Sequence, residues 1–302
     1  MTDATTDATH IAPSRSIADP LRQVTSGVTR WHGDVSAEAT DELVAEEPLE
    51  IRALSGERSG AAETIAVIMR TPGHDEELAA GFLFSEGLIT RADELDTLTP
   101  GLDADALPSP NILDVRAAAG VSLGQRMREA GYSRQFAVNS SCGVCGKNTV
   151  EAACALLPPV SLDGFSVAPT TLYRLPDRLR AEQRVFSATG GLHGAALFDG
   201  AGALVAVRED VGRHNAVDKL VGRALLARET PLRECALMVS GRLSFEIVLK
   251  ALVARIPIIA AVSAPSSLAI DLARSGGITL VGFLRGESCN VYTWPERIQG
   301  RQ

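Results

Sequence analysis

Cys142 and Cys145 form a Cys-x-x-Cys pair inside the segment Ser-Ser-Cys-Gly-Val-Cys-Gly-Lys. The thiolate is the nucleophilic form of cysteine, and a helix N-terminus or a nearby cation such as Lys147 lowers the pKa of a thiol. The flanking glycines and serines predict a mobile loop, and a helix is expected directly after it. Both thiols are therefore placed for reaction.

Three functions compete for this pair: a redox dithiol, half of a zinc site, and a carrier of persulfide sulfur. A structural zinc site needs about four ligands, and the sequence has no second Cys-x-x-Cys and no His-x-x-x-His. A thioredoxin-type pair is expected at a strand end in a βαβ unit, which fits this segment poorly. Two incidental loop cysteines are the remaining interpretation.

Two histidines, His193 and His214, stand at the two ends of a predicted hairpin. The polar segment around His214 opens a helix, where backbone N–H groups and Arg213 can hold an anion. Arg242 and Arg285 each follow a predicted strand, and ligands of open α/β sheets collect at such strand ends. Hydrogen-bonded capping loops and solvated arginines are the alternative interpretation.

The composition limits the class of protein. With 302 residues, 45% of them hydrophobic, the chain can form two globular parts. A net charge of −8 and a pI near 5.2 argue against a general nucleic-acid or membrane-surface binder. No signal peptide or membrane span is predicted, and five cysteines, an odd number, fit a reduced compartment. We expect a soluble cytoplasmic protein.

The first half of the chain predicts a small α+β unit. Residues 1–25, rich in Thr, Ala, Asp and Ser, are expected to form a disordered tail. Two short apolar runs, 48–54 and 64–69, predict a hairpin, and a helix with Asp75 as N-cap should follow. A loop and two further strands are expected at 103–110, 112–116 and 135–138. These elements define an N-terminal α+β domain at residues 26–139.

The second half is more regular. Residues 193–198 and 203–207 flank a Gly-rich turn and predict a second hairpin. A helix should follow it, because apolar residues recur at helical spacing between Val217 and Leu225. Strands then alternate with helices, at 236–239, 256–263 and 278–283. This order predicts an α/β fold with a three-layer α/β/α domain and a mixed sheet at residues 149–302, after a mobile Cys-x-x-Cys loop at 140–148.

Several motifs together resemble one known family. They are Met-Arg-Thr-Pro-Gly-His-Asp at 69–75, the Cys-x-x-Cys loop, Thr-Gly-Gly-Leu-His at 189–193, Glu-Asp-Val-Gly-Arg-His-Asn-Ala-Val-Asp-Lys at 209–219, and Leu-Val-Gly-Phe-Leu-Arg-Gly at 280–286. In this order they resemble the FdhD family, the formate dehydrogenase accessory sulfurtransferases. The similarity extends over residues 28 to 296.

The resemblance implies a sulfur carrier. Such a protein is loaded by a cysteine desulfurase and passes sulfur to the molybdenum bis(guanine dinucleotide) cofactor before this enters the formate dehydrogenase catalytic subunit. Cys142 would bear the persulfide, with Cys145 as a partner thiol that relays or resolves sulfur. The resemblance also implies a cofactor-binding segment at Phe283, Leu284, Arg285, Gly286, Glu287 and Ser288. We add His193, His214 and Arg242 as candidates for contact with its guanine nucleotide.

The second domain also resembles the cytidine deaminase-like fold. Zinc deaminases use His-x-Glu and Pro-Cys-x-x-Cys, but the corresponding places here read Arg213 to Ala216 and Ser240 to Ser244. We therefore expect no permanently bound metal, and a scaffold that binds a guanine nucleotide without deaminating it. The family resemblance implies a homodimer. A cofactor-binding chaperone that transfers no sulfur and a metal-dependent hydrolase are the alternative functions.

Overall fold

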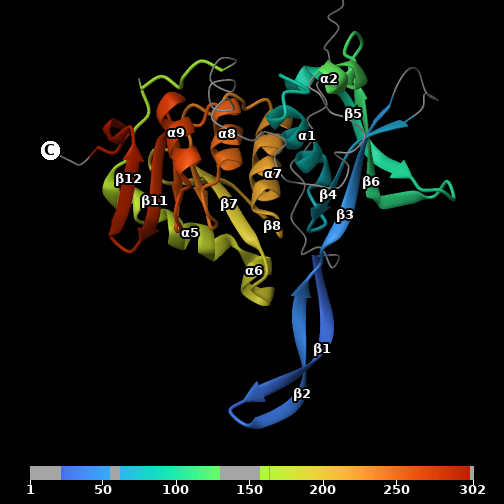
Figure 1. Ribbon diagram of the computed structural model, residues 1–302, viewed down its shortest axis with the longest axis horizontal. Helices are drawn as coiled ribbons and strands as arrows, with labels where there is room; N and C mark the ends of the chain where they lie inside the picture. Colours follow the sequence, from blue (N-terminus) through green and yellow to red (C-terminus); the bar gives the residue numbers. More distant parts are fainter. Residues whose placement is uncertain (1–21, 55–61, 130–156, 163, 300–302) are drawn as a thin grey trace, which may run out of the picture.

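A six-stranded mixed sheet forms the C-terminal part of the protein. The computed structural model describes residues 22–54, 62–129, 157–162 and 164–299 (Figure 1). The strand order is β12-β11-β10-β9-β7-β8, in which β9, β10 and β11 are parallel and the remaining pairs are antiparallel. The bounds are β7 His193–Phe198, β8 Leu204–Asp210, β9 Ala236–Val239, β10 Ile258–Ala261, β11 Thr279–Arg285 and β12 Ser288–Thr293.

Helices cover both faces of this sheet. One face carries α7 (Arg213–Leu226), α8 (Phe245–Val253) and α9 (Ser267–Ser275), and the other carries α4 (Pro169–Leu172), α5 (Leu175–Glu182) and α6 (Arg184–Thr189) (Figure 1). Successive residues of a strand point to opposite faces. In β9, Leu237 and Val239 pack with the first set of helices, whereas Ala236 and Met238 pack with α4 and α5. The predicted α/β fold with three layers is confirmed.

The N-terminal part forms a four-stranded sheet of order β4-β3-β6-β5. Its elements are β3 (Glu47–Leu54), β4 (Ala62–Arg70), α1 (Asp75–Ser85), β5 (Leu95–Leu102), β6 (Pro108–Ala117) and α2 (Leu123–Glu129). The predicted first hairpin is confirmed, because β3 and β4 pair antiparallel. The strand predicted at 112–116 is part of β6, which begins within the predicted 103–110 loop.

Helices α1 and α7 join the two parts in one hydrophobic core. They cross so closely that a Cβ on Gly222 would lie 1.8 Å from the backbone oxygen of Glu77, and one on Gly81 would lie 1.9 Å from that of Asp218. Only glycine allows this approach. The predicted domain boundaries at 139 and 149 lie outside the described residues.

Strands β1 (Gln23–His32) and β2 (Val35–Val44) pair as a separate two-stranded ribbon that projects from the body (Figure 1). The predicted disordered tail was wrong at its end, because residues 23–25 belong to β1. The sequence does not predict this ribbon, since most of its side chains are exposed on both faces and show no simple apolar alternation.

The predicted helix after Thr71-Pro72-Gly73 is confirmed, but its predicted N-cap was wrong. The cap is His74, whose φ of 58° is left-handed. Asp75 is the first helical residue, and its carboxylate accepts two 3.0 Å hydrogen bonds from buried Arg70. The bidentate Arg70 contact therefore replaces the capping role that we predicted for Asp75. The strand predicted at 135–138 lies outside the described residues.

Within the described ranges, no helix has the length and apolar character needed to cross a bilayer.

Candidate functional site

The predicted site residues that the structure describes lie together at one end of the strands of the six-stranded sheet. This end, where the parallel strands finish, is here called the sheet edge. The parallel strands β9, β10 and β11 all end at this edge, and antiparallel β7 begins there. His193 is the first residue of β7 and His214 the second of α7; Arg242 lies between β9 and α8. The 283–288 segment ends β11 and turns into β12. Ligands of open α/β sheets bind at such an edge.

Backbone hydrogen bonds connect the loops of this edge. The N–H of Ser240 donates to the oxygen of Gly194 at 2.9 Å, and that of Leu243 donates to Ala264 at 3.1 Å. The N–H of Phe283 in turn donates to the oxygen of Ser263 at 3.1 Å. The loops after β9 and β10 and the end of β11 are therefore held at fixed positions relative to one another.

The two histidines lie on the α7 face of the sheet. Nε2 of His214 is 3.1 Å from Oγ of Ser244 and 3.7 Å from Oε2 of Glu246. Burial, followed by the nearby Arg213 charge, lowers the pKa of His214 to about 4. Burial and Arg213 also lower the pKa of His193. Both rings are therefore neutral near pH 7, and each offers a nitrogen that can accept a hydrogen bond.

Positive charge gathers at the start of α7. Arg213 is its first residue, and its Nε atom is buried without a hydrogen-bond partner among the described residues. The preceding Gly212 has no side chain to cap the helix, so backbone N–H groups remain available at an end where the helix dipole favours anions. Arg242 adds an exposed guanidinium on the next loop. The edge is therefore suited to a phosphate group.

The 283–288 segment presents an aromatic ring and a cation. Phe283 has a left-handed φ of 53° and is 38% exposed, although Leu284 beside it is fully buried. The Arg285 guanidinium lies 5.9 Å from the centre of the Phe283 ring. Gly286, with φ of 55°, allows the turn into β12, where Glu287 and Ser288 are exposed. An exposed ring beside cationic groups can stack on a nucleobase.

A set of polar residues for which no role was predicted positions the start of α7. Nζ of Lys219 lies 2.7 Å from Oδ2 of Asp210 and donates to the backbone oxygen of Thr71 at 2.8 Å. Asn215 donates to Asp210 and to the oxygen of Met69. The available signal was Asn215 and Lys219, two polar residues four positions apart, on the same side of the helix as the apolar residues that predict its buried face.

The resemblance to zinc deaminases compares the segments that contain His214 and Ser244 with the two zinc-ligand motifs of those enzymes. Here the two side chains share a hydrogen bond. In the described part of the chain, no group of three or more His, Cys, Asp or Glu side chains is placed to hold a metal ion.

Cys142 and Cys145, the pair predicted to be reactive, lie outside the described residues. Of the cysteines that the structure describes, Cys235 has a pKa raised by burial to about 11, and burial also raises the pKa of Cys289. Since the thiolate is the reacting form, these two are poor nucleophiles near pH 7.

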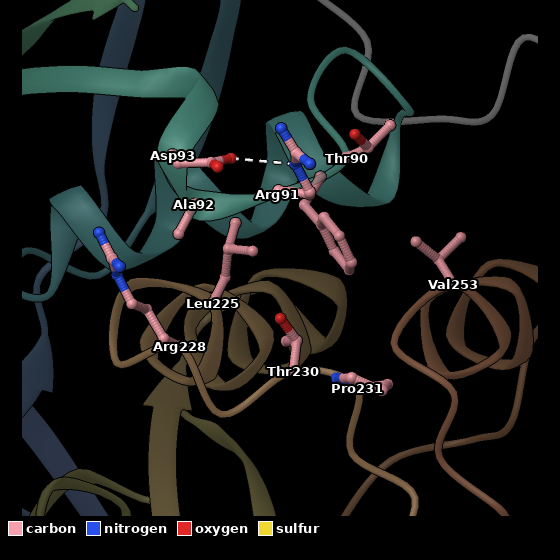
Figure 2. Close-up of a pocket in the computed structure, with 10 residues that line it drawn as sticks. Thr90, Arg91, Ala92, Asp93, Leu225, Arg228, Thr230, Pro231 and Val253 are labelled. Atoms are coloured by element: carbon pink, nitrogen blue, oxygen red, sulfur yellow. Dashed lines mark ion pairs between the residues drawn. The ribbon is translucent and has the colours of Figure 1, made fainter.

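A cavity of about 400 Å³ lies at another place in the fold (Figure 2). It is bounded by Thr90 to Asp93, by the end of α7 with Arg228, and by Val253 of α8 (Figure 2). A second cavity of about 360 Å³ lies beside His74. The candidate site is therefore an open sheet edge that neither cavity represents.

Known proteins of one family are similar to this chain along most of its length. The FdhD/NarQ family model matches residues 44–299. Proteins named sulfur carrier protein FdhD from Streptomyces avermitilis and Sulfurisphaera tokodaii are 54% and 42% identical, covering 85% and 90% of this chain and 89% and 97% of their own. A crystal structure described as that of a formate dehydrogenase accessory protein from Desulfotalea psychrophila has a TM-score of 0.70 and 27% identity, covering 93% of this chain and 100% of its own. The chain therefore belongs to the FdhD/NarQ family, as its motifs predicted.

Proposed function

We propose that this chain is a sulfur carrier that accepts sulfur on Cys142 from a cysteine desulfurase. It delivers the sulfur to the molybdenum bis(guanine dinucleotide) cofactor destined for formate dehydrogenase. The names of its relatives support the carrier role, and the name of the similar structure supports service to formate dehydrogenase. The supporting observation in the fold is the sheet edge that gathers Arg213, Arg242 and the Phe283 ring.

Loading is a thiol exchange. The Cys142 thiolate attacks the terminal sulfur of the desulfurase persulfide, a new S–S bond forms at Cys142, and the desulfurase cysteine leaves as a thiolate. Electrons and atoms balance without a further reductant. Cys145 is then the thiol available to relay or resolve that sulfur.

The cofactor is a substrate, and its guanine nucleotide is the part that the sheet edge fits. Arg213 and the free N–H groups at the start of α7 take a phosphate, and the Phe283 ring stacks on the base. The neutral rings of His193 and His214 accept hydrogen bonds from hydroxyl or amine groups of the nucleotide. Buried Leu284 fixes the backbone that presents Phe283 and Arg285.

The proposal places the protein in the reducing cytoplasm, where Cys142 stays available as a thiol. Its partners are a cysteine desulfurase and the formate dehydrogenase catalytic subunit.

Mass spectrometry after incubation with a cysteine desulfurase and cysteine tests the carrier role. We expect one added sulfur on the peptide containing Cys142, absent from Cys142→Ala. The control is Cys235→Ala, which removes a poorly nucleophilic thiol and should load like the wild type. If a known acceptor loads and this chain does not, the carrier role is wrong and the cofactor-binding chaperone is the better interpretation.

A further inference from the structure

The cavity of about 400 Å³ at the ends of α7 and α8 has apolar walls and cationic groups at its mouth (Figure 2). Leu225 of α7 and Val253 of α8 point towards the 90–93 segment, which bounds the cavity on its other side (Figure 2). Phe84 of α1 adds an aromatic ring to the lining. The N-terminal and C-terminal parts of the protein thus both form walls, and the volume is within the range of about 300–1,000 Å³ that ligand sites have.

This cavity is separate from the sheet edge. Helix α7 has 14 residues; it begins with Arg213 at the sheet edge, and its other end carries Leu225 beside the cavity. A rise of about 1.5 Å per residue puts the two ends of the helix about 20 Å apart. A small ligand in the cavity therefore does not touch the residues proposed to hold the nucleotide.

Arg228, which lines the cavity, has a left-handed φ of 59° directly after the last turn of α7. Its N–H donates to the oxygen of Leu225 at 2.9 Å, and the N–H of Glu229 donates to that of Ala224 at 2.8 Å. These two bonds form a Schellman motif, in which glycine is favoured because a Cβ strains left-handed backbone. Helix α1 ends in the same way with Gly87, whose φ is 72°. At the end of α7 an arginine stands where glycine would be less strained.

Helix α8 shows how an arginine at the same position is used. Arg255 has a φ of 65°, and its N–H donates to the oxygen of Leu252 at 3.1 Å. Its guanidinium donates to the backbone oxygens of Pro158 and Pro159. The Arg228 guanidinium, by contrast, has no hydrogen bond or ion pair with the residues that the structure describes, and it extends towards the 90–93 segment at the side of the cavity (Figure 2). We therefore expect its acceptor to come from a ligand.

The charges around the cavity indicate the kind of ligand. The charged residues of its lining are Arg91, Asp93 and Arg228. Arg91 and Asp93 pair at 3.0 Å, so one positive charge is left over at Arg228, in a chain with a net charge of −8. A guanidinium binds a carboxylate through two parallel hydrogen bonds. A single surplus charge matches a carboxylate better than a phosphate dianion.

We propose that this cavity binds a small organic carboxylate with an aromatic, apolar body. The carboxylate accepts hydrogen bonds from the Arg228 guanidinium and from the Thr230 hydroxyl, which also lines the cavity. The apolar body packs on Phe84, Leu225 and Val253, where removal of its surface from water favours binding. An organic cation is excluded because Arg228 repels it.

A ligand-observed NMR titration of the full chain with 2-naphthoate tests the proposal. Wild type should bind this probe with a Kd on the order of 1 mM or tighter. Acetate keeps the carboxylate without the apolar body, and 2-naphthamide keeps the body without the charge. Each should bind at least about tenfold more weakly than 2-naphthoate, since each lacks one of the two contributions.

Arg228→Gly separates ligand binding from a structural role of the arginine. Glycine adopts the left-handed φ without strain, so the midpoint of urea unfolding should hold or rise, whereas the affinity for 2-naphthoate should fall at least about tenfold. Arg228→Lys keeps the charge and should recover part of that affinity. The matched control is Arg274→Gln, an arginine in the last turn of α9 whose ion pair with Asp271 is exposed; it should bind the probe like wild type.

Arg213→Gln should also bind 2-naphthoate like wild type, because Arg213 lies at the other end of α7. A loss of affinity in this variant would place the probe at the sheet edge and overturn the proposal. Wild type that does not bind 2-naphthoate, Arg228→Gly that binds it unchanged, or 2-naphthamide that binds equally well would each overturn it too. None of these measurements involves sulfur loading of Cys142, so the proposed carrier function stands or falls independently.

Discussion

Nζ of Lys219 lies 2.7 Å from Oδ2 of Asp210, and both side chains are completely buried. The same ammonium donates to the backbone oxygen of Thr71, while the N–H of Thr71 donates to Asp210. Burial lowers the pKa of Lys219, and Asp210 opposes that change. This ion pair fastens the 69–75 motif to the start of α7, which carries Arg213 and His214.

Lys219→Met removes the ammonium but keeps most of the side-chain volume. Breaking one partner of a buried pair leaves the other charge uncompensated, so we expect the free energy of unfolding to fall by about 3–5 kcal/mol. The control is Arg223→Met on the same helix, whose ion pair with Glu229 is partly exposed and should cost about 1 kcal/mol or less. Urea unfolding measures both, and similar losses would contradict the prediction.

Gly222→Ala tests the close crossing of α1 and α7. Its Cβ would meet the backbone oxygen of Glu77 at 1.8 Å, so the helices must separate, at a cost of about 1–3 kcal/mol or more. Gly124→Ala in α2 is the control, because its nearest neighbour is the end of the flexible Glu63 side chain and alanine favours the helix by about 1 kcal/mol. In thermal unfolding, the melting temperature of Gly222→Ala should be lower than that of Gly124→Ala. Equal melting temperatures would show that the crossing of α1 and α7 tolerates a methyl group.

Arg213→Gln tests the phosphate contact at the start of α7. With guanosine diphosphate as the probe, titration calorimetry should show affinity at least about tenfold lower than wild type, since a charged hydrogen bond to phosphate is lost. Arg223→Gln, later in the same helix, should bind like wild type. Equal binding by both variants would remove Arg213 from the nucleotide site.

Phe283→Gly distinguishes the backbone strain at position 283 from the role of the Phe283 ring in nucleotide binding. Glycine adopts the observed φ of 53° freely, so the free energy of unfolding should hold or rise despite the loss of a ring. Guanosine diphosphate should bind about tenfold or more weakly, because stacking on an aromatic ring contributes about 1–3 kcal/mol per base. Unchanged affinity would show that the ring does not contact the base.

The lowered pKa values of two histidines predict how the free energy of unfolding changes with pH. The pKa of His214 is lowered to about 4 by burial and Arg213, and that of His74 to about 3 by burial and Arg208. Between pH 6.5 and these values the unfolded chain binds more protons than the folded chain. The free energy of unfolding should therefore fall below pH 6.5, by on the order of 2 kcal/mol per histidine by pH 5. In urea unfolding, His214→Gln should lose less between pH 7 and 5 than wild type, and an identical loss would refute the assignment.

Much of the fold followed from local sequence. The alternation of strands and helices from β7 to β11 was predicted because apolar residues recur at helical spacing in the helices and form short runs in the strands. The candidate site residues were predicted because they follow the ends of strands, where ligands of open α/β sheets bind. The β1–β2 ribbon was not predicted because most of its side chains are exposed on both faces and show no simple apolar alternation. Helices α4, α5 and α6 were missed as well, since they are short and two of them are four and six residues long.

The sequence by itself determined the family motifs, the Cys142 and Cys145 pair, and the order of strands and helices in the second half. Only the tertiary structure decided which motif contacts which. Glu209 and Asp210 are consecutive in β8 and therefore point to opposite faces: Glu209 accepts from the N–H groups that begin α6, whereas Asp210 binds Thr71, 139 residues away. Such pairings depend on contacts between distant segments, which local periodicity does not encode.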